Sequence, residues 1–450
     1  MATRRSLRAD LCTTKLLASL GIPLLLQLSA CVFANDTVTL AVLLPVSGAR
    51  PIGRTVGSAV AIAVDDINAD ASLLPRTRLR FVWSDTKCDE TQGLARVVEF
   101  LTGDVRVDAF IGPGCDDVCQ SAGLLAAHWN VPMVSWGCTS SALTAGDRYP
   151  TFARTVGTLT LAAPMVTAIL KHWRWRNACI LTSTNVNWER AAKAIKFNLE
   201  ENRIHVRFYE SFEPGASERE RHARMVETTK SQCRITIICA DAGDVRSILM
   251  NALKLDMLSS SDYVFITFEL SAEAHVAANS WMGKFDPPET DPDAFFAFKG
   301  LLNINIGSLQ TEEYKAFKEK VRQRMADPPF EMRIPKKNQV GTQDALLYDA
   351  VKLYALALHD HLQFGGTPLD GMSGPIFIDA QGNRAPDYVL QNFKDDFYAF
   401  AFYRHSDGTL MVNKSYVVIF PGGGTIVPED HPPCGWNNEF CVELMGNLDI

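Results

Sequence analysis

The sequence lacks the features of several protein classes. It has no basic excess, since 44 Lys and Arg stand against 51 Asp and Glu for a formal net charge of −7. This balance gives no electrostatic case for nucleic-acid binding. After the N-terminal region no window holds 18 uninterrupted apolar residues, so we expect no later segment to cross a bilayer.

The motifs of common enzyme sites are also missing. There is no Gly-x-Ser-x-Gly, no His-Glu-x-x-His and no Walker-type phosphate loop. His359-Asp360-His361 ends an expected helix, where side chains two residues apart diverge, so a helix-end charge pair is favoured over a metal site. We therefore predict no catalytic residue, no metal and no organic cofactor.

The N-terminus has the pattern of a signal sequence. A basic lead with three arginines and Lys15 precedes a mainly apolar run from Leu16 to Ala30. Val32 and Ala34 suit the positions before a cleavage after Ala34. The run is short for a spanning helix, which makes a membrane anchor the weaker alternative. We predict residues 1–34 to be a signal peptide and the chain to be extracellular, either secreted or on the outer face of the plasma membrane.

The chain has eleven cysteines, and removal of Cys12 and Cys31 with the signal peptide would leave nine. Export makes disulfides plausible, and an odd number leaves at least one thiol free or paired with another chain. Two glycosylation sequons gain weight from the predicted export, so we predict glycans on Asn35 and Asn413.

From residue 37 strand-like and helix-like segments alternate. The expected strands of a first series are at 38–45, 79–83, 109–112 and 131–135, and the expected helices are at 55–67, 93–101 and 121–129. A second series has strands at 178–181, 206–209, 235–239 and 263–268, and helices at 159–173, 191–200, 219–229 and 244–255. Strands this apolar are typical of parallel sheets covered by helices on both faces. Two doubly wound α/β lobes are therefore predicted.

The remaining segments are expected to return to both lobes. They are a loop at 280–293, a helix at 344–362, and strands at 376–379, 397–402 and 412–419, the last two forming a hairpin. Such a clamp would have a central cleft that suits a ligand. The predicted boundaries are 35–151 with 274–366 for lobe 1, 152–273 with 367–433 for lobe 2, and 434–450 for a tail.

Several segments resemble the ectodomain of natriuretic peptide receptors and receptor guanylyl cyclases. They are Leu44-Pro45, Ser84 to Cys88, Gly112 to Cys115, Ala127 to Met133, Ser261 to Phe265, Leu353 to His359 and Pro433 to Glu439. Their order and spacing span Thr37 to Cys441 and argue against a chance match. The resemblance implies a type I periplasmic-binding-protein-like fold and a homodimer that binds a peptide hormone. Signalling would follow from rearrangement of the dimer, through cyclic GMP where a cyclase is attached.

The resemblance also implies the disulfides Cys88–Cys115 and Cys434–Cys441. Cys119 lies near a helix start and Cys138 follows a strand of the same lobe, so we expect a bridge between them. The pairing of three other cysteines stays open. Cys179 and Cys239 fall within apolar strands and fit buried thiols, while Cys233 is unassigned.

The motif Gly112-Pro113-Gly114-Cys115 follows a strand and precedes a helix. Glycines at such a turn let backbone N–H groups point at an anion. The resemblance implies a chloride held by Gly114, Cys115 and a serine, best matched by Ser84. The alternative is a tight turn that holds a disulfide.

Four carboxylates, Asp89, Glu90, Asp116 and Asp117, flank the two cysteines of the first expected bridge. In the family a carboxylate just after the first cysteine pairs with an arginine of the peptide ring, and Glu90 has the matching position. Asp117 stands where relatives offer an aromatic contact, so the peptide preference should differ. The alternative is a solvated acidic loop.

Other functions stay open. Thr139 and Ser140 follow a strand end where amino-acid receptors of the same fold hold a ligand carboxylate, although such residues are also ordinary turn residues. A small-molecule sensor and a secreted decoy are therefore alternatives. The resemblance places a dimer face on the expected helices 55–67 and 93–101. Only nine residues, 442–450, follow Cys441, so we expect a soluble receptor, a truncated isoform or an incomplete gene model, with a membrane link only through a segment absent from this sequence.

Overall fold

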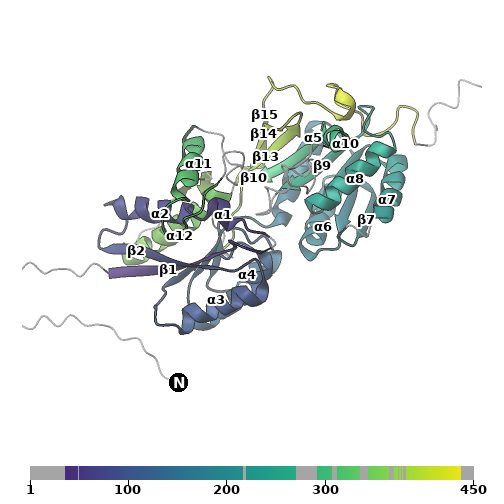
Figure 1. Ribbon diagram of the computed structural model, residues 1–450. Helices are drawn as coiled ribbons and strands as arrows, with labels where there is room; N and C mark the ends of the chain where they lie inside the picture. Colours follow the sequence, from purple (N-terminus) through teal and green to yellow (C-terminus); the bar gives the residue numbers. More distant parts are fainter. Residues whose placement is uncertain are drawn as a thin grey trace, which may run out of the picture. The chain divides into compact units, whose positions relative to one another are not determined.

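The computed structural model describes residues 36–48, 50–215, 219–269, 291–306, 312–334, 343–363, 369–372, 374–376, 378 and 382–436. A first sheet has the order β2-β1-β3-β4-β5, with every described pair parallel (Figure 1). Its strands are β1 (Asp36–Leu44), β2 (Thr77–Asp85), β3 (Ala109–Ile111), β4 (Met133–Ser135) and β5 (Phe152–Arg154). The predicted signal peptide and Asn35 lie outside the described residues.

Helices cover both faces of this sheet. One face carries α1 (Gly53–Val56), α2 (Ala59–Ala69), α11 (Glu312–Arg324) and α12 (Gln343–Gln363), and the other carries α3 (Glu90–Thr102) and α4 (Asp116–Trp129). Strand β1 shows why. Leu40 and Val42 pack in the cluster that includes α2 and α12, whereas Ala41 and Leu43 pack with α3 and α4. Because successive strand side chains point to opposite faces, a continuous apolar run buries both sides of the sheet.

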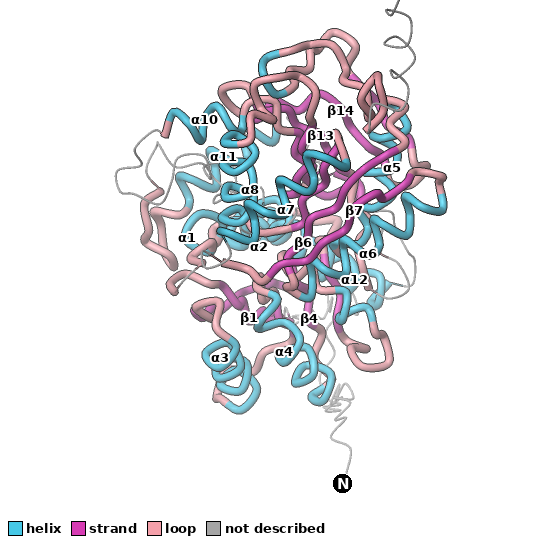
Figure 2. The backbone as a smooth tube through the Cα atoms, turned by 90° about the vertical axis from the view of Figure 1, so that its right-hand side faces the viewer, coloured by secondary structure: helices cyan, strands magenta, loops and turns pink. Residues whose placement is uncertain are grey.

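The second sheet has the order β15-β14-β13-β10-β9-β8-β6-β7. Its strands are β6 (Asn177–Ser183), β7 (His205–Phe212), β8 (Ile235–Cys239), β9 (Val264–Glu269), β10 (Leu302–Ile306), β13 (Tyr388–Phe393), β14 (Phe397–Arg404) and β15 (Thr409–Val412). The strands β6, β7, β8, β9 and β10 pair in parallel, and β13, β14 and β15 extend the sheet in antiparallel pairs. In Figure 2 these strands run between helices.

The helices over the second sheet form two layers. One layer holds α5 (Ala163–His172) and α6 (Val186–Glu201), and the other holds α7 (Arg219–Gln232), α8 (Ala242–Lys254) and α10 (Pro292–Phe298). Shorter elements are η1 (Ser141–Thr144), η2 (Leu159–Ala162), η5 (Pro421–Gly423), and the hairpin of β11 (Leu369–Gly371) and β12 (Gly374–Ile376). The α/β fold class is as predicted, with a parallel first sheet and a second sheet that adds antiparallel strands to a parallel part. Among the described helices, none combines the length and the apolar character that a membrane span requires.

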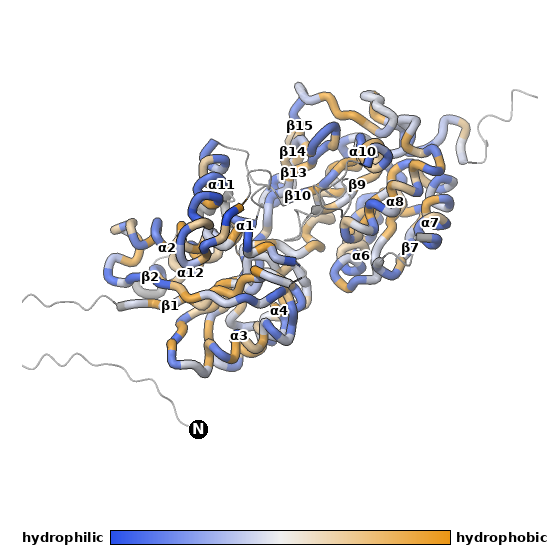
Figure 3. The backbone as a smooth tube through the Cα atoms, viewed as in Figure 1, coloured by the Kyte–Doolittle hydropathy of each residue, from blue (hydrophilic) through white to orange (hydrophobic). Residues whose placement is uncertain are grey.

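Hydropathy explains why the sheet cores were predictable. In Figure 3 the strand β1 is largely coloured as hydrophobic, whereas α3 carries both hydrophobic and hydrophilic colours. This mixture matches a helix with one buried face.

Three predicted boundaries differ from the structure. Strand β5 pairs with β4 in the first sheet, although residues 152–154 were placed in lobe 2. Elements α10 and β10 belong with the second sheet, because Ile304 pairs with Phe268 of β9 and with Leu390 of β13. The predicted hairpin strand at 412–419 is also wrong. Arg404 pairs with Thr409, so the partner strand begins at Thr409 and ends at Val412.

Two segments that join the sheets lie side by side. One follows β5 and the other precedes β13, and the Arg154 N–H donates to the Gly382 carbonyl at 2.9 Å. A Cβ on Gly157 would lie only 2.4 Å from Cδ of Pro386. Glycine at this position therefore permits the close approach of the two crossover segments.

The segment after η5 docks against the start of β6. The Trp175 indole N–H donates to the Pro428 carbonyl at 2.8 Å. The Asp430 carboxylate accepts from the backbone N–H groups of Arg176 and Asn177 and from the side chain of Asn177. Burial raises the pKa of Asp430, but the hydrogen bonds from His431, Arg176 and Asn177 outweigh burial and lower it overall.

We predict that Asp430→Ala lowers the free energy of unfolding by about 1–3 kcal/mol, because buried N–H groups lose their acceptor. A lowered pKa in the folded state means that this stabilisation is present above the unfolded pKa of about 3.9 and is lost as the pH falls through the folded value. Urea unfolding between pH 7 and pH 3 should therefore show a steeper loss for the wild type than for the variant. Glu429→Ala, which removes an exposed neighbouring carboxylate, should behave like the wild type.

Candidate functional site

Disulfides hold one end of the first sheet together. Cys88–Cys115 joins the segment after β2 to the residue that caps α4, and Cys119–Cys138 joins α4 to the segment after β4. Both pairs agree with the sequence-based expectation. Cys434 is also disulfide-bonded, and Cys441, its expected partner, lies outside the described residues.

The second sheet contains a disulfide that sequence reasoning missed. Cys179 of β6 pairs with Cys233, which follows α7, so Cys179 is not the buried thiol that its apolar strand suggested. An apolar strand indicates burial, but it does not tell whether a second cysteine approaches from a neighbouring turn. Cys239 is a free and fully buried thiol, and burial raises its pKa.

The four carboxylates near the first bridge occupy different environments. Asp89 caps α3 by accepting the Gln92 N–H at 2.8 Å. Glu90 is exposed and accepts a hydrogen bond from the Ser121 hydroxyl, and Asp117 is exposed in the first turn of α4. Carboxylates in first turns also compensate the positive end of the helix dipole. The acidic loop is therefore partly structural, and Glu90 and Asp117 leave negative charge on the surface.

Asp116 points inward instead. Its carboxylate accepts the Thr139 hydroxyl at 2.8 Å, the Ser140 N–H at 2.8 Å and the Asn187 side-chain amide at 3.1 Å. Burial raises the pKa of Asp116, more than the hydrogen bonds from Ser140 and Thr139 and the charge of Arg154 lower it. Because Asn187 belongs to α6, this carboxylate links the α4 end of the first sheet to a helix of the second.

A second contact lies beside the first. The Arg190 guanidinium on α6 donates to the Ser141 hydroxyl at 3.3 Å. The start of α6 and the Thr139–Ser141 segment therefore face each other across the two halves. Sequence reasoning singled out Thr139 and Asp116 but missed Asn187 as their partner, because nothing in the local sequence around α6 points to the first lobe.

Arg154, a residue that sequence reasoning also missed, lies behind this contact. The side chain is fully buried, and its Nη1 donates to the carbonyls of Cys138 and Ser140 at 2.8 and 2.9 Å. Its Nε and Nη2 donate to Oδ1 of Asn383 at 2.9 and 2.6 Å. One guanidinium thus connects the loop that holds Asp116 to the crossover segment before β13. Arg154 ends the three-residue strand β5, which the sequence pattern did not predict, and a buried charge of this kind requires such partners.

A second buried arginine lies in the adjacent crossover. Arg384 donates to the Thr155 carbonyl at 3.2 Å, and its Nη1 is 3.9 Å from the Asp349 carboxylate on α12. Thr155 in turn donates its hydroxyl to the Leu346 carbonyl at 2.8 Å. Charged and polar groups, rather than apolar packing alone, therefore fix the path of the crossovers over the end of the first sheet.

The Gly112–Cys115 turn has donors that suit an anion. The Trp136 indole is fully buried, and a Cβ on Gly112 would lie 3.2 Å from its Nε1. This indole N–H has no hydrogen-bond partner among the described residues. A buried donor without an acceptor therefore lies next to the start of α4.

Ser84, the serine expected at this anion, is half-buried on β2 opposite Leu43. Two residues later, the Thr86 hydroxyl is buried and has no partner in the described part of the chain. The Thr86 N–H donates to the Leu44 carbonyl, so Thr86 lies beside the last residue of β1. Thr86 is thus a second hydroxyl candidate, which sequence matching did not single out. No group of three or more His, Cys, Asp or Glu side chains suited to a metal occurs among the described residues.

Residues 55–396 match a family model described as the receptor family ligand binding region. The chain belongs to this family. The guanylate cyclase 2G of Mus musculus is 23% identical over 422 residues, which cover 86% of this chain and 37% of the relative. The gamma-aminobutyric acid type B receptor subunit 1 of Mus musculus is 25% identical over 401 residues, which cover 80% and 39%.

A third relative, the atrial natriuretic peptide receptor 3 of Homo sapiens, is 24% identical over 338 residues. That alignment covers 71% of this chain and 60% of the relative. The chain therefore spans between 37% and 60% of the length of these three proteins. The predicted resemblance to natriuretic peptide receptors and receptor guanylyl cyclases is confirmed at the level of the family.

We predict that Asn187→Asp separates α6 from the Thr139–Ser141 segment, because two carboxylates would meet where an amide now donates to Asp116. Hydrogen exchange of backbone amides in 138–142 should become at least threefold faster at pH 7.5. The difference should shrink toward pH 5, because the raised pKa of Asp116 lets it take up a proton.

Asn185→Asp is the matched control, since it adds the same charge at the cap of α6 without a described contact to Asp116. Equal exchange rates in the two variants would show that the Asp116–Asn187 contact does not hold the halves together.

Proposed function

We propose that this receptor ligand-binding region binds a peptide in the extracellular space. The choice of ligand rests on one observation: the donors of Thr139 and Ser140 are already hydrogen-bonded within the chain. In amino-acid receptors of this fold, donors at this place hold the ligand's carboxylate, but here the hydroxyl and the backbone N–H are both bonded to the chain's own Asp116. An internal carboxylate in this position competes with a free amino acid and does not compete with a peptide that binds elsewhere.

The exposed acidic edge supports a basic peptide. Glu90 and Asp117 start two helices whose ends the Cys88–Cys115 bridge holds together. A peptide guanidinium could pair with a carboxylate at this edge, and the Ser121 hydroxyl restrains Glu90 from the next helix. Such a pair fixes orientation because an arginine can present two parallel N–H donors to one carboxylate.

Glu90→Gln should weaken the binding of an arginine-containing cyclic peptide by at least tenfold, since it removes the charge and keeps the side-chain size. The control is Glu99→Gln, which removes an exposed carboxylate from the last turns of the same helix. Calorimetry on both purified variants gives the two affinities. An unchanged affinity for Glu90→Gln would refute the role of Glu90.

The second candidate function is a small-molecule sensor, which the similarity to a gamma-aminobutyric acid type B receptor subunit favours. Titration of the purified chain with amino acids and with basic cyclic peptides separates the two functions. Peptide binding with no response to amino acids supports the first, and the reverse result supports the second. A secreted decoy would bind the same peptide, so it differs from a signalling receptor only in what is attached to the chain.

The dimer expected from the resemblance needs a corrected surface. Helix α2 packs against α11 and α12 and buries most of its length, which argues against the expected face at 55–67. Helices α3 and α4 pack side by side and expose apolar side chains, namely Val98 at 41% and Leu124 at 37%. Trp129, at the end of α4, is 45% exposed. We infer a homodimer formed by the outer faces of α3 and α4.

Val98→Asp should shift the chain from dimer toward monomer by at least tenfold in the dissociation constant, because a carboxylate would be buried at a symmetric contact. Sedimentation equilibrium measures the shift. Phe197→Asp is a suitable control, because Phe197 is 67% exposed on α6 of the other half. A dimer that survives Val98→Asp would exclude this face.

Two further proposals concern a chloride ion near α4 and a glycan on Asn413. We infer that chloride binds beside the Gly112–Cys115 turn, where Gly114 and Cys115 present backbone donors and Trp136 presents its buried indole N–H. The ion would be structural, because it would neutralise donors at the start of α4 rather than contact a substrate. Asn413 is exposed and follows β15, which supports its predicted glycosylation.

A further inference from the structure

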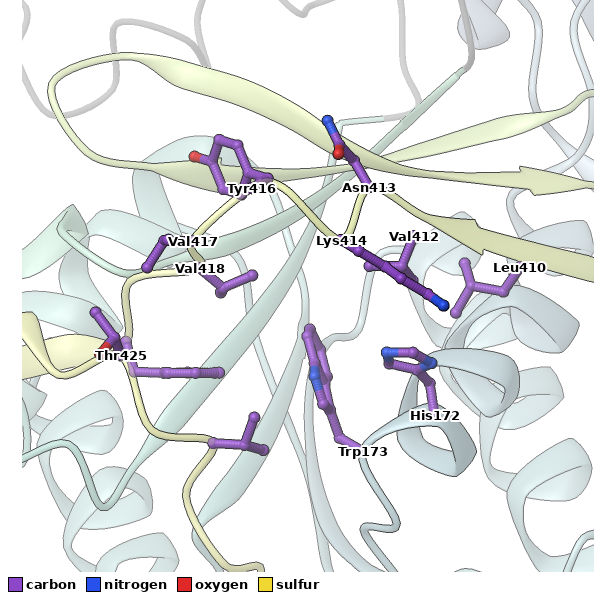
Figure 4. A pocket seen from close by; sticks show the side chains of 12 residues that line it. His172, Trp173, Leu410, Val412, Asn413, Lys414, Tyr416, Val417, Val418 and Thr425 are labelled. Atoms are coloured by element: carbon purple, nitrogen blue, oxygen red, sulfur yellow. The ribbon is translucent and has the colours of Figure 1, made fainter.

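A groove outside the site already described lies at the end of α5. It has a volume of about 560 Å³ and is bounded by His172 and Trp173, by β15 and by residues of the 413–427 segment. Figure 4 shows Trp173 on its floor, with Val418 and Leu410 on either side. This size lies in the range of small-molecule sites, and most of its side chains are apolar.

The surface around the groove is also apolar. Val417 is 57% exposed, Ile426 is 84% exposed and Val427 is 40% exposed. Side chains of this kind that gather at one place mark a contact with an apolar partner more often than isolated ones do. The apolar walls therefore continue to the mouth of the groove.

The charged side chain that lines the groove is a lysine. Lys414 and His172 line the groove, and Figure 4 shows both on the same side of it. No Asp or Glu is among the lining residues. Among the described residues neither the Lys414 nor the His172 side chain has an ion-pair or hydrogen-bond partner. A lysine ammonium beside apolar side chains, in a groove that no Asp or Glu lines, is complementary to an anion.

The predicted glycan does not block this groove. Asn413 Oδ1 accepts the Ser415 N–H at 3.0 Å, and Figure 4 shows the Asn413 side chain directed away from Trp173. A sugar on Asn413 would therefore extend from the rim. The groove and the glycosylation site can be occupied together.

We propose that this groove binds a small amphipathic monoanion, a molecule with an aliphatic or aromatic body and one carboxylate or sulfonate. The body would lie on Trp173, Leu410 and Val418, and the anionic group would bind the Lys414 ammonium with His172 beside it. The groove lies apart from the Asp116–Asn187 contact and involves none of its residues, so this ligand is distinct from the proposed peptide.

The test uses the whole chain and three ligands of equal length, namely decanoate, decanol and decylammonium, each below its micelle concentration. Each competes with the fluorescent aromatic sulfonate 8-anilinonaphthalene-1-sulfonate. Decanoate should displace the probe at a concentration at least tenfold lower than decanol, and decylammonium should be the weakest. Hydrogen exchange should slow within residues 410–427 when decanoate binds.

Lys414→Met should weaken decanoate at least tenfold and leave decanol within twofold, because it removes the charge and keeps the apolar stem and the sequon. Lys254→Met, an exposed lysine on α8, is the matched control. Equal affinity for the three ligands, no saturable binding of decanoate, protection confined to residues outside 172–173 and 410–427, or an unchanged decanoate affinity in Lys414→Met would each overturn the proposal.

Discussion

The site depends on the hydrogen bonds that the buried Arg154 guanidinium donates. It donates to the carbonyls of Cys138 and Ser140 and to Asn383, so it connects the loop after β4 with the crossover before β13. That loop supplies the two donors that hold the Asp116 carboxylate. Without a cation at this place, several buried carbonyl and amide oxygens would lose their hydrogen-bond donors at once. Apolar packing cannot offset the free-energy cost of leaving these oxygens unpaired.

The Cys119–Cys138 bridge and Arg154 act on the same loop from different sides. The bridge ties the loop to α4, and Arg154 ties it to the crossover before β13. Asp116 at the start of α4 is therefore positioned by covalent and polar restraints together, and Asn187 of α6 reaches it from the second sheet. The contact between the halves is thus a polar one with a defined direction, which a change in charge can weaken without disturbing either core.

Most of the fold could be predicted from the sequence, because inner strands such as β3 and β8 are apolar and fully buried and many of the intervening helices have one apolar face. Short or polar strands could not be predicted in this way. The strand β10 alternates Asn with apolar residues over five positions, and its place between β9 and β13 depends on chain segments far apart in the sequence. Asn187, Asn383 and Arg384 could not be predicted for the same reason. Each makes its contact with a partner in the other half or in another crossover, far away in the sequence. Motif matching located Asp116 and Thr139, but it could not show that they satisfy each other.

The odd cysteine of the second sheet has a consequence for disulfide exchange. Cys239 lies on β8, next to the strand that carries the Cys179–Cys233 bridge, and burial keeps its thiol protonated. Exchange requires a thiolate, so this neighbour is a poor nucleophile toward the bridge. The same apolar packing that stabilises the core thus protects the pairing of the other cysteines against reshuffling while the chain is folded.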